Sequence, residues 1–286
     1  MVSVAFFGDL HIGANGMFLA QGQDFDTILD NILYNFQQIL DEIDKKVGRK
    51  VYIAFLGDMA DMITKNSVGN LYFQKMPPED QIEIVKQLIE KFKDRIIGMV
   101  SGNHDFRMMK EAGFDYLKFI AKELDIPYSP TLLTVVLECN GFDISIALHH
   151  GVSGGRSKAA SVRQNEYFLS AIQNVDIYVT GHTHTANITS HMQRLYDKDV
   201  VLKPTKLITV SSFLHDKDYA LRKLLPPTGF DIPVATCYTE TRKIKMAGSE
   251  IIHTEKIIDA SLVTSYVVNF LVKNALFKKV SEAYGS

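Results

Sequence analysis

The chain has few cysteines: of its 286 residues only Cys139 and Cys237 carry a thiol. Two cysteines so far apart make no disulfide framework, and they lack the close paired spacing of a thiolate metal site. A disulfide scaffold is therefore excluded. The cysteine content favours a reducing, cytoplasmic location.

Long apolar runs and a strong excess of one charge are also missing. No run approaches the roughly 18 apolar residues that a membrane-spanning helix needs, and the N-terminal stretch MVSVAFFGDL lacks the basic residues and the apolar length of a signal peptide. The formal net charge of −2 excludes a chain-wide basic surface of the kind most nucleic-acid binders carry, although it leaves room for a local basic groove. We therefore expect no membrane association.

Internal repeats, low-complexity tracts and linkers rich in proline, glycine or serine are absent as well. With 46% hydrophobic and 22% charged residues, the chain has an ordinary globular composition. We expect one catalytic domain over residues 1–258 and a C-terminal helical tail over residues 259–286. The apolar residues of the tail, from Val267 to Val280, recur at helical steps. They predict a helix docked on the domain, and the alternative is an exposed face that binds a protein partner or a second copy.

The first two thirds of the chain alternate between apolar strands and amphipathic helices. Strands are predicted at 2–9, 50–58, 95–103 and 175–182, helices at 24–46, 77–94, 112–124 and 161–174, and a hairpin at 132–151. After residue 187 we expect short strands, at 206–213, 231–239, 243–248 and 250–258, that form a facing sheet. This order predicts an α/β (α+β) architecture.

Five of the apolar strand candidates end in side chains that can bind a metal ion. The five ends are GDLH (Asp9, His11), GDMAD (Asp58), GNHD (Asn103, His104), LHHG (His149, His150) and GHTH (His182, His184). One such end is weak evidence, because strands often stop at Gly-Asp turns. Five ends that can meet at the carboxyl edge of a sheet predict a site. We expect the glycines before Asp9, Asp58, Asn103 and His182 to let the backbone bend sharply there.

The ligand types narrow the choice of metal. Imidazole and carboxylate without thiolate suit Mn, Fe, Zn or Ni better than Ca or Cu(I). We expect Mn, with Fe, Zn, Ni or Mg as alternatives. Seven candidate ligands are too many for one ion and suit two divalent ions that share a carboxylate. Two such ions can clamp a phosphoryl group and hold a bridging hydroxide for in-line attack.

The order Asp-x-His, Gly-Asp, Gly-Asn-His-Asp, His-Gly and Gly-His-x-His, over about residues 3–186, resembles the calcineurin-like metallophosphoesterase superfamily. The resemblance implies a four-layer fold of two facing mixed β-sheets flanked by helices. It also implies two metal sites that share Asp58 as a bridge. The first would be held by Asp9, His11 and His184, and the second by Asn103, His150 and His182.

The resemblance implies different roles for the neighbours of these ligands. His104 would face the substrate as the general acid, and Asp105 would orient its imidazole. His150 is preferred to His149 because the family ligand usually precedes the glycine, and His149 would point to the opposite side of the strand. Arg107 and Arg156 are candidates for contacting the substrate phosphate, with solvated surface arginines as the alternative.

Within the superfamily, the motifs most resemble those of DNA-repair exonucleases and compact phage or bacterial phosphoesterases. GDMAD keeps the spacing of the exonuclease motif, including the trailing Asp61, whereas Gly151 stands where those enzymes usually have Gln. GDMADM lacks the arginine of the protein phosphatase motif. The leading hypothesis is a dinuclear-metal phosphodiesterase, with DNA exonuclease or endonuclease activity as one form.

The alternatives are a phosphomonoesterase or nucleotide phosphohydrolase, and a non-catalytic binding or scaffold protein on the same fold. The intact ligand set argues against a scaffold. A DNA substrate would need a basic lip around the crevice, and a dispersed solvated surface is the alternative use of the same cations. The candidate residues for the lip are Lys203, Lys206, Lys217, Arg222, Lys223, Arg242, Lys243 and Lys245.

Overall fold

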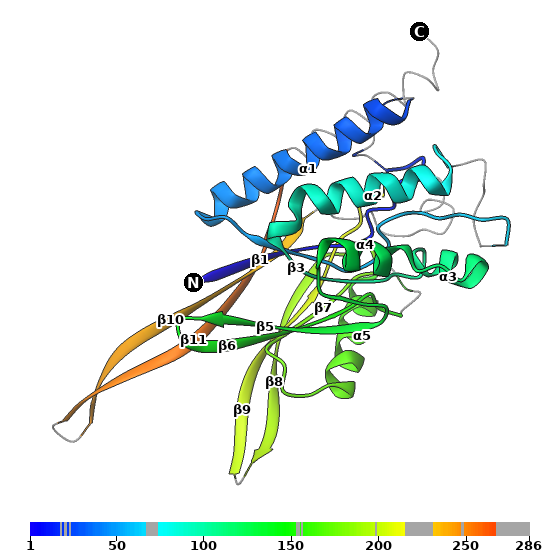
Figure 1. Ribbon diagram of the computed structural model, residues 1–286. Coiled ribbons are helices and arrows are strands. Elements are labelled where there is room, and N and C mark those ends of the chain that lie inside the picture. The colour runs from blue at the N-terminus through cyan, green and yellow to red at the C-terminus, as the bar shows by residue number, and fades with distance from the viewer. Residues whose placement is uncertain are drawn as a thin grey trace.

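The computed structural model describes residues 1–17, 19, 22, 24–66, 74–152, 155, 157–197, 199–214, 231–246 and 249–266. Within them, the side chains of 196, 197, 199–201, 242–246 and 249–253 are not described. Two mixed β-sheets pack face to face, and helices cover their outer faces (Figure 1). The predicted four-layer architecture is confirmed.

The first sheet has the strand order β11-β10-β1-β2-β3-β4. Its strands are β1 (Val2–Phe7), β2 (Tyr52–Phe55), β3 (Ile96–Val100), β4 (Tyr128–Ser129), β10 (Ile232–Met246) and β11 (Ser249–Val263). Strands β1 to β4 run parallel to one another, while β10 is antiparallel to β1 and to β11. The carboxyl ends of β1, β2 and β3 therefore lie at one edge.

The second sheet has the order β5-β6-β7-β9-β8. Its strands are β5 (Leu132–Cys139), β6 (Phe142–His149), β7 (Ile177–Thr180), β8 (Asn187–Asp197) and β9 (Asp199–Thr209). Strand β6 is parallel to β7, and β7 is parallel to β9. An apolar core lies between the sheets, with Phe6, Leu56, Ile146 and Val179 each at most 1% exposed. Burying each such side chain stabilises the fold by about 1.5–3 kcal/mol.

The helices cover the two outer faces. They are α1 (Phe25–Val47), α2 (Pro78–Phe92), α3 (Phe106–Ala112), α4 (Tyr116–Leu124) and α5 (Lys158–Ala171), with a 3₁₀ turn at Lys93–Arg95. Helix α1 begins at Asp24, whose side chain accepts a hydrogen bond from the Thr27 amide, and ends at Gly48 in the left-handed conformation. Helices α1, α2 and α4 bury their apolar faces on the first sheet, and α5 packs on the second. No helix in the described part of the chain is long and apolar enough to span a membrane.

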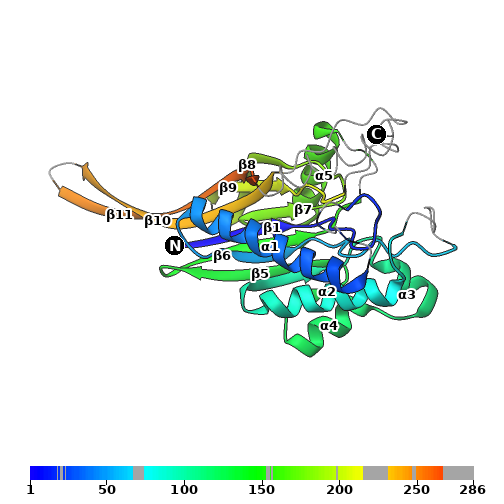
Figure 2. The same ribbon diagram turned by 90° about the horizontal axis from the view of Figure 1, so that it is seen from above.

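The C-terminal third differs from the prediction. In place of the expected short strands there are two long hairpins, and the predictions at 231–239 and 243–248 both fall on the single strand β10 (Ile232–Met246). The hairpins do not share one sheet: β8 and β9 extend the second sheet, whereas β10 and β11 extend the first. Antiparallel neighbours pair along their whole length, so a strand can continue through residues that show no burial pattern. Both hairpins project from the body (Figures 1 and 2).

Two further boundaries differ. Helix α3 was not predicted, because none of its residues is buried and its sequence therefore shows no apolar period. Strand β11 continues to Val263, past the expected domain boundary at residue 258. The tail from residue 267 onward lies outside the described residues, so its helix and the division into two parts stay predictions.

Candidate metal centre

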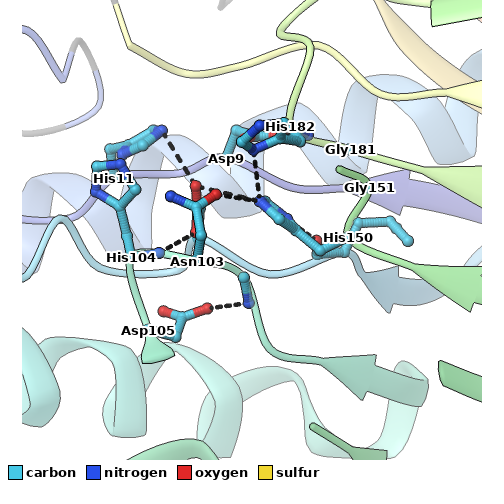
Figure 3. A network of polar contacts seen from close by, with 12 residues as sticks. Asp9, His11, Asn103, His104, Asp105, His150, Gly151, Gly181 and His182 are labelled. Carbon is cyan, nitrogen blue, oxygen red and sulfur yellow. Dashed lines mark hydrogen bonds and ion pairs between the residues drawn. The ribbon is translucent and has the colours of Figure 1, made fainter. Parts of the chain in front are cut away.

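The predicted site residues meet where five strands end. The loops after β1, β2 and β3 of the first sheet face the loops after β6 and β7 of the second. Figure 3 shows the side chains of Asp9, His11, Asn103, His150 and His182 pointing toward one another from these loops. The structure therefore brings the predicted strand-end residues together.

The first group of side chains contains Asp9, His11 and His184. All three are buried, and one ligand atom from each lies within 4.8 Å of the others. The Nε2 atom of His184 lies 3.2 Å from Oδ1 of Asp9 and 3.4 Å from Nε2 of His11. This is the set predicted for the first metal.

The second group contains Asp58, His150 and His182, again within 4.8 Å. The Nε2 atom of His150 lies 3.3 Å from Oδ2 of Asp58, 3.2 Å from Nδ1 of His182 and 3.0 Å from Oδ1 of Asn103. The Oδ2 atom of Asp58 is also 4.0 Å from Nε2 of His11 in the first group. Asp58 thus lies between the two groups, as a bridging ligand would.

The chemistry of these donors fits divalent cations. Oδ1 of Asp9 is buried, has no hydrogen bond of normal geometry, and lies 3.2 Å from Nε2 of His184, which also faces His11. Imidazole nitrogens also face each other in pairs, His11 with His184 and His150 with His182, where at most one nitrogen of each pair can carry the hydrogen. A cation can bind the buried carboxylate oxygen and both facing imidazole nitrogens at the same time. A proton can be bonded to only one of these atoms.

The charges within the cluster shift its acids and bases in opposite directions. Burial favours the neutral form of Asp58, but His150 and His104 outweigh it and hold its pKa well below the usual range. Burial likewise opposes charge on His150, but Asp58 and Asp9 raise the pKa of that imidazole to about 10. The carboxylates therefore create a strongly negative potential at the place where the cations would bind.

The backbone bends at the ligands rather than at the glycines before them. Asp9, Asp58 and His182 have φ values of 51°, 50° and 68°, and His11 and His184 are also in the left-handed region. Of the four preceding glycines, only Gly57 has a positive φ, of 83°. The expected glycine bend is therefore wrong for the other three. Left-handed non-glycine residues cost about 1–3 kcal/mol each and occur mainly at functional sites.

The glycines instead permit close contact between the loops. A Cβ atom on Gly102 would lie 2.1 Å from Oδ1 of Asp58, and one on Gly57 would lie 2.3 Å from the Gly102 nitrogen. Only a residue without a side chain fits where the β2 and β3 loops touch.

Asp105 does not have the predicted role. Its carboxylate accepts hydrogen bonds from the amides of Met59, Ala60 and Gly102 and from the hydroxyl of Tyr116. In Figure 3 it lies apart from the metal-ligand side chains. These contacts use both oxygens to join the β2 and β3 loops, and the His104 ring is not among its partners.

Asp61 orients His104 instead. The Nδ1 atom of His104 lies 2.8 Å from the carbonyl oxygen of Asp61 and 3.0 Å from its Oδ1. The same Oδ1 lies 3.2 Å from Nδ1 of His11. Burial favours the neutral acid, but His104 and His11 hold the pKa of Asp61 far below its usual range. The GDMAD spacing contained a signal for this residue, although the sequence did not reveal its partner.

Arg107 lies beside His104. Its guanidinium donates to the Asp61 carbonyl oxygen at 2.7 Å and contacts Nε2 of His104 at 3.1 Å. The side chain is half-buried, so the alternative of a fully solvated surface arginine is wrong. Arg156 lies outside the described residues, and its predicted phosphate contact stays a prediction.

Helix α5 positions the loops of the second group. Gln164 accepts from the Val152 amide at 3.0 Å and donates to the Gly181 carbonyl oxygen at 3.1 Å. His149 faces this helix, with its ring centroid 5.5 Å from that of Phe168. His150, rather than His149, therefore belongs to the cluster.

The predicted basic lip is not formed by the lysines and arginines whose positions are described. Lys206 pairs with Ile177 at the start of β7, whereas the site follows the end of β7 at Thr180. In the first sheet, Cys237 pairs with Val2 at the start of β1, and β10 then continues away from the site. This register places Lys203 farther from the crevice than Lys206. It also places Arg242, Lys243 and Lys245 farther from the crevice than Cys237. Lys217, Arg222 and Lys223 lie outside the described residues.

Comparisons with known proteins agree with this geometry. Residues 2–186 match the family described as calcineurin-like phosphoesterase, and the chain belongs to that family. Its membership and the buried Asp/His clusters indicate a metal-dependent phosphoesterase that binds divalent metal. A comparison with curated proteins finds no match.

Solved structures with similar folds are distant. Vacuolar protein sorting 29 from Cryptosporidium parvum is 15% identical with a TM-score of 0.41, over 90% of this chain and 98% of that one. A protein of unknown function from Aquifex aeolicus is 17% identical with a TM-score of 0.34, over 64% of this chain and 80% of that one.

Proposed function

We propose that this phosphoesterase hydrolyses phosphodiester bonds with two divalent cations, manganese being the first choice. The observation that carries the proposal is the position of Asp58 between two buried ligand groups, beside His104. Asp9, His11 and His184 would hold one cation, Asn103, His150 and His182 the other, and Asp58 both. The bound cations would supply neutralisation of phosphoryl charge and a nucleophile at neutral pH.

The residues of the chain would handle the leaving group. His104 would donate a proton from Nε2 to the departing oxygen, while its Nδ1 stays bonded to Asp61. The contacts of Nδ1 with Asp61 fix the orientation of the ring and leave Nε2 for the leaving oxygen. Arg107, which contacts Nε2 of His104, would move its hydrogen bonds to a phosphate oxygen when the substrate arrives.

The backbone contact to Asp58 supports this arrangement. The amide of His104 donates to Oδ1 of Asp58 at 2.7 Å, so the proposed acid and the proposed bridging ligand have a fixed separation. A fixed separation between the acid and the attacked phosphorus is what in-line displacement requires. The cytoplasm remains the proposed location, supported by the free, buried thiols of Cys139 and Cys237.

A substrate panel tests the proposal. Chelator-treated protein is compared with Mn²⁺-loaded protein on a phosphomonoester, a phosphodiester, a cyclic nucleotide and single- and double-stranded DNA. We expect metal-dependent hydrolysis with the diester preferred, and DNA cleavage would identify a nuclease. Full activity after chelation would exclude the dinuclear mechanism, monoester preference would exclude the diesterase, and no turnover of any substrate would favour the scaffold alternative.

A further inference from the structure

Residues 106–119, over α3 and the start of α4, expose large apolar side chains next to the metal centre. Phe106, Met109, Phe114 and Phe119 are 41%, 43%, 41% and 56% exposed. Single exposed apolar residues are normal, but a concentration of them within a short segment marks an interaction surface. Helix α3 has no fully buried residue, and Met108 packs against the core, so packing does not explain the exposed Phe106 and Met109.

This surface continues directly from the proposed acid. Phe106 follows His104 by two residues, which places their Cα atoms within about 7.6 Å. Arg107 of the same helix contacts His104. Both views place α3 at the end of the molecule opposite the tip of the β10–β11 hairpin (Figures 1 and 2). Because His104 would protonate the leaving oxygen, α3 lies on the leaving-group side of the scissile bond.

The surface combines aromatic rings with charged residues, of which Arg107, Lys110 and Lys118 are cations and Glu111 and Asp115 are anions. The ammonium of Lys110 lies 5.6 Å from the centroid of the Phe106 ring, and the rings of Phe114 and Phe119 are 6.0 Å apart. Lys118 is exposed beside Phe119. An acyl chain would need apolar surface without interleaved charges, whereas flat rings among cations suit a nucleobase and the phosphates joined to it.

We propose that the aromatic surface of residues 106–119 binds a nucleobase of the leaving group, so that the substrate is a nucleotide phosphodiester. This inference rests on the proposed function. Phe106 would stack on the base next to the scissile phosphate, and Phe114 and Phe119 would contact a following base where the substrate is a strand. The ligand chemistry is shared by dinucleotides and single-stranded nucleic acid.

The test compares a thymidine dinucleotide with its abasic analogue, which keeps the sugars and the phosphate. Steady-state kinetics in Mn²⁺ are measured for wild type, Phe106→Ala, Phe106→Leu and Tyr34→Ala. Tyr34 is a matched aromatic control, 63% exposed on α1. We expect Phe106→Ala to raise KM for the dinucleotide by about 5- to 150-fold and to leave KM for the abasic analogue and both kcat values near wild type. Phe106→Leu should behave like Phe106→Ala, and Tyr34→Ala like wild type.

If Phe106→Ala raises KM equally for the dinucleotide and the abasic analogue, or changes neither KM, the inference is overturned and the phosphodiesterase proposal stays intact. A wild-type KM in Phe106→Leu would also overturn it, because any apolar side chain would then serve.

A second experiment adds Phe119→Ala and measures KM for a ten-nucleotide strand and for the dinucleotide. A larger increase in KM for the strand identifies single-stranded nucleic acid as the ligand, and equal increases identify the dinucleotide. If wild type hydrolyses nothing, the proposed function fails separately. Anisotropy of the labelled strand in Mn²⁺ then tests the surface, and equal affinity of wild type and Phe106→Ala would overturn it.

Discussion

Asp61 contacts two imidazoles that have different proposed tasks. Its carboxylate lies 3.0 Å from Nδ1 of His104 and 3.2 Å from Nδ1 of His11. The contact with His104 fixes the ring of the proposed acid. The contact with Nδ1 of His11 orients that ring so that its Nε2 can bind a metal ion. Such supporting contacts fix the tautomer and the ring orientation of the imidazole.

Asp61→Asn tests this role. The amide is a weaker acceptor than the carboxylate and holds the His104 ring less firmly, so we expect kcat to fall by about 10- to 100-fold with an alkoxide leaving group. The deficit should be smaller with p-nitrophenolate, which needs no protonation. Kinetics on both substrates and the metal content of the purified variant measure this. Equal losses on the two leaving groups would contradict a role through His104.

The metal content of purified variants distinguishes the proposed ligand Asp58 from the proposed general acid His104. We expect His104→Ala to retain both metals and to lose about 10²–10⁴-fold in kcat, the usual contribution of a general acid. Asp58→Asn should lose more activity and also metal, because Asp58 lies between the two ligand groups. Mass spectrometry of bound metals and kinetics decide between them. Loss of both metals from His104→Ala would make that residue a ligand.

Gly102 is predicted to be irreplaceable for a packing reason. In Gly102→Ala the new Cβ would meet Oδ1 of Asp58 at 2.1 Å, so we expect loss of activity and weakened metal binding. Gly141→Ala is the control, since its Cβ would meet nothing within 4 Å although its φ is 80°. That variant should lose about 1 kcal/mol of stability and no activity. Wild-type activity in Gly102→Ala would show that the loops can separate without consequence.

At the scale of elements, Asp176 ties the two sheets together. It precedes β7 and accepts from the amide and hydroxyl of Ser145 on β6, at 2.8 and 2.9 Å. It also pairs with Lys203 of β9 at 3.3 Å and with Lys256 of β11 at 2.8 Å. Strand β11 belongs to the other sheet, so this buried carboxylate links both layers.

The Asp176 cluster should make stability depend on acid pH. Burial opposes its charge, but Lys256 and Ser145 outweigh burial and lower the pKa below the ordinary 3.8. The stabilisation is therefore fully present above pH 4 and is lost as the pH falls through the folded-state pKa. We expect Asp176→Asn to cost about 1–3 kcal/mol at pH 7, with the difference from wild type shrinking toward pH 3. Urea unfolding at several pH values measures it, and a difference that is independent of pH would contradict the ion pairs.

At the scale of the whole molecule, the metal centre couples the two sheets. Its ligands come from β1, β2 and β3 on one side and from β6 and β7 on the other. Without cations, burial and repulsion by Asp58 oppose the charge of Asp9, and the neighbouring His184 and His150 outweigh them and lower its pKa. Bound cations would remove this repulsion and hold the two layers together.

Metal removal should therefore lower the thermal stability of the folded chain. At a free Mn²⁺ concentration of about 100 times Kd, we expect binding to contribute about 2.7 kcal/mol. The midpoint of thermal unfolding should rise with Mn²⁺ concentration in wild type and much less in Asp58→Asn. An equal rise in the two proteins would indicate binding elsewhere.

The accuracy of the sequence predictions depended on how local the signal was. Strands β1, β2, β3 and β7 were predicted because buried strands read as continuous apolar runs that stop at polar turns. Helix α3 was missed, since its exposed residues carry no such pattern, and the short strands predicted after residue 187 are parts of two long hairpins. The described lysines and arginines form no basic lip, and only the strand register shows that Lys206 and β10 lie at the other end of their sheets.

The sequence by itself determined which side chains emerge at the strand ends, because each motif is a local turn that follows a local apolar run. It therefore pointed to Asp9, Asp58 and His182 without any knowledge of distance, and the family resemblance selected His150 over His149. Only the tertiary structure decided that Asp61 rather than Asp105 contacts His104, since both are acids close to the motifs and no spacing distinguishes their partners. Contacts between loops depend on how the sheets pack, and packing joins residues far apart in the chain.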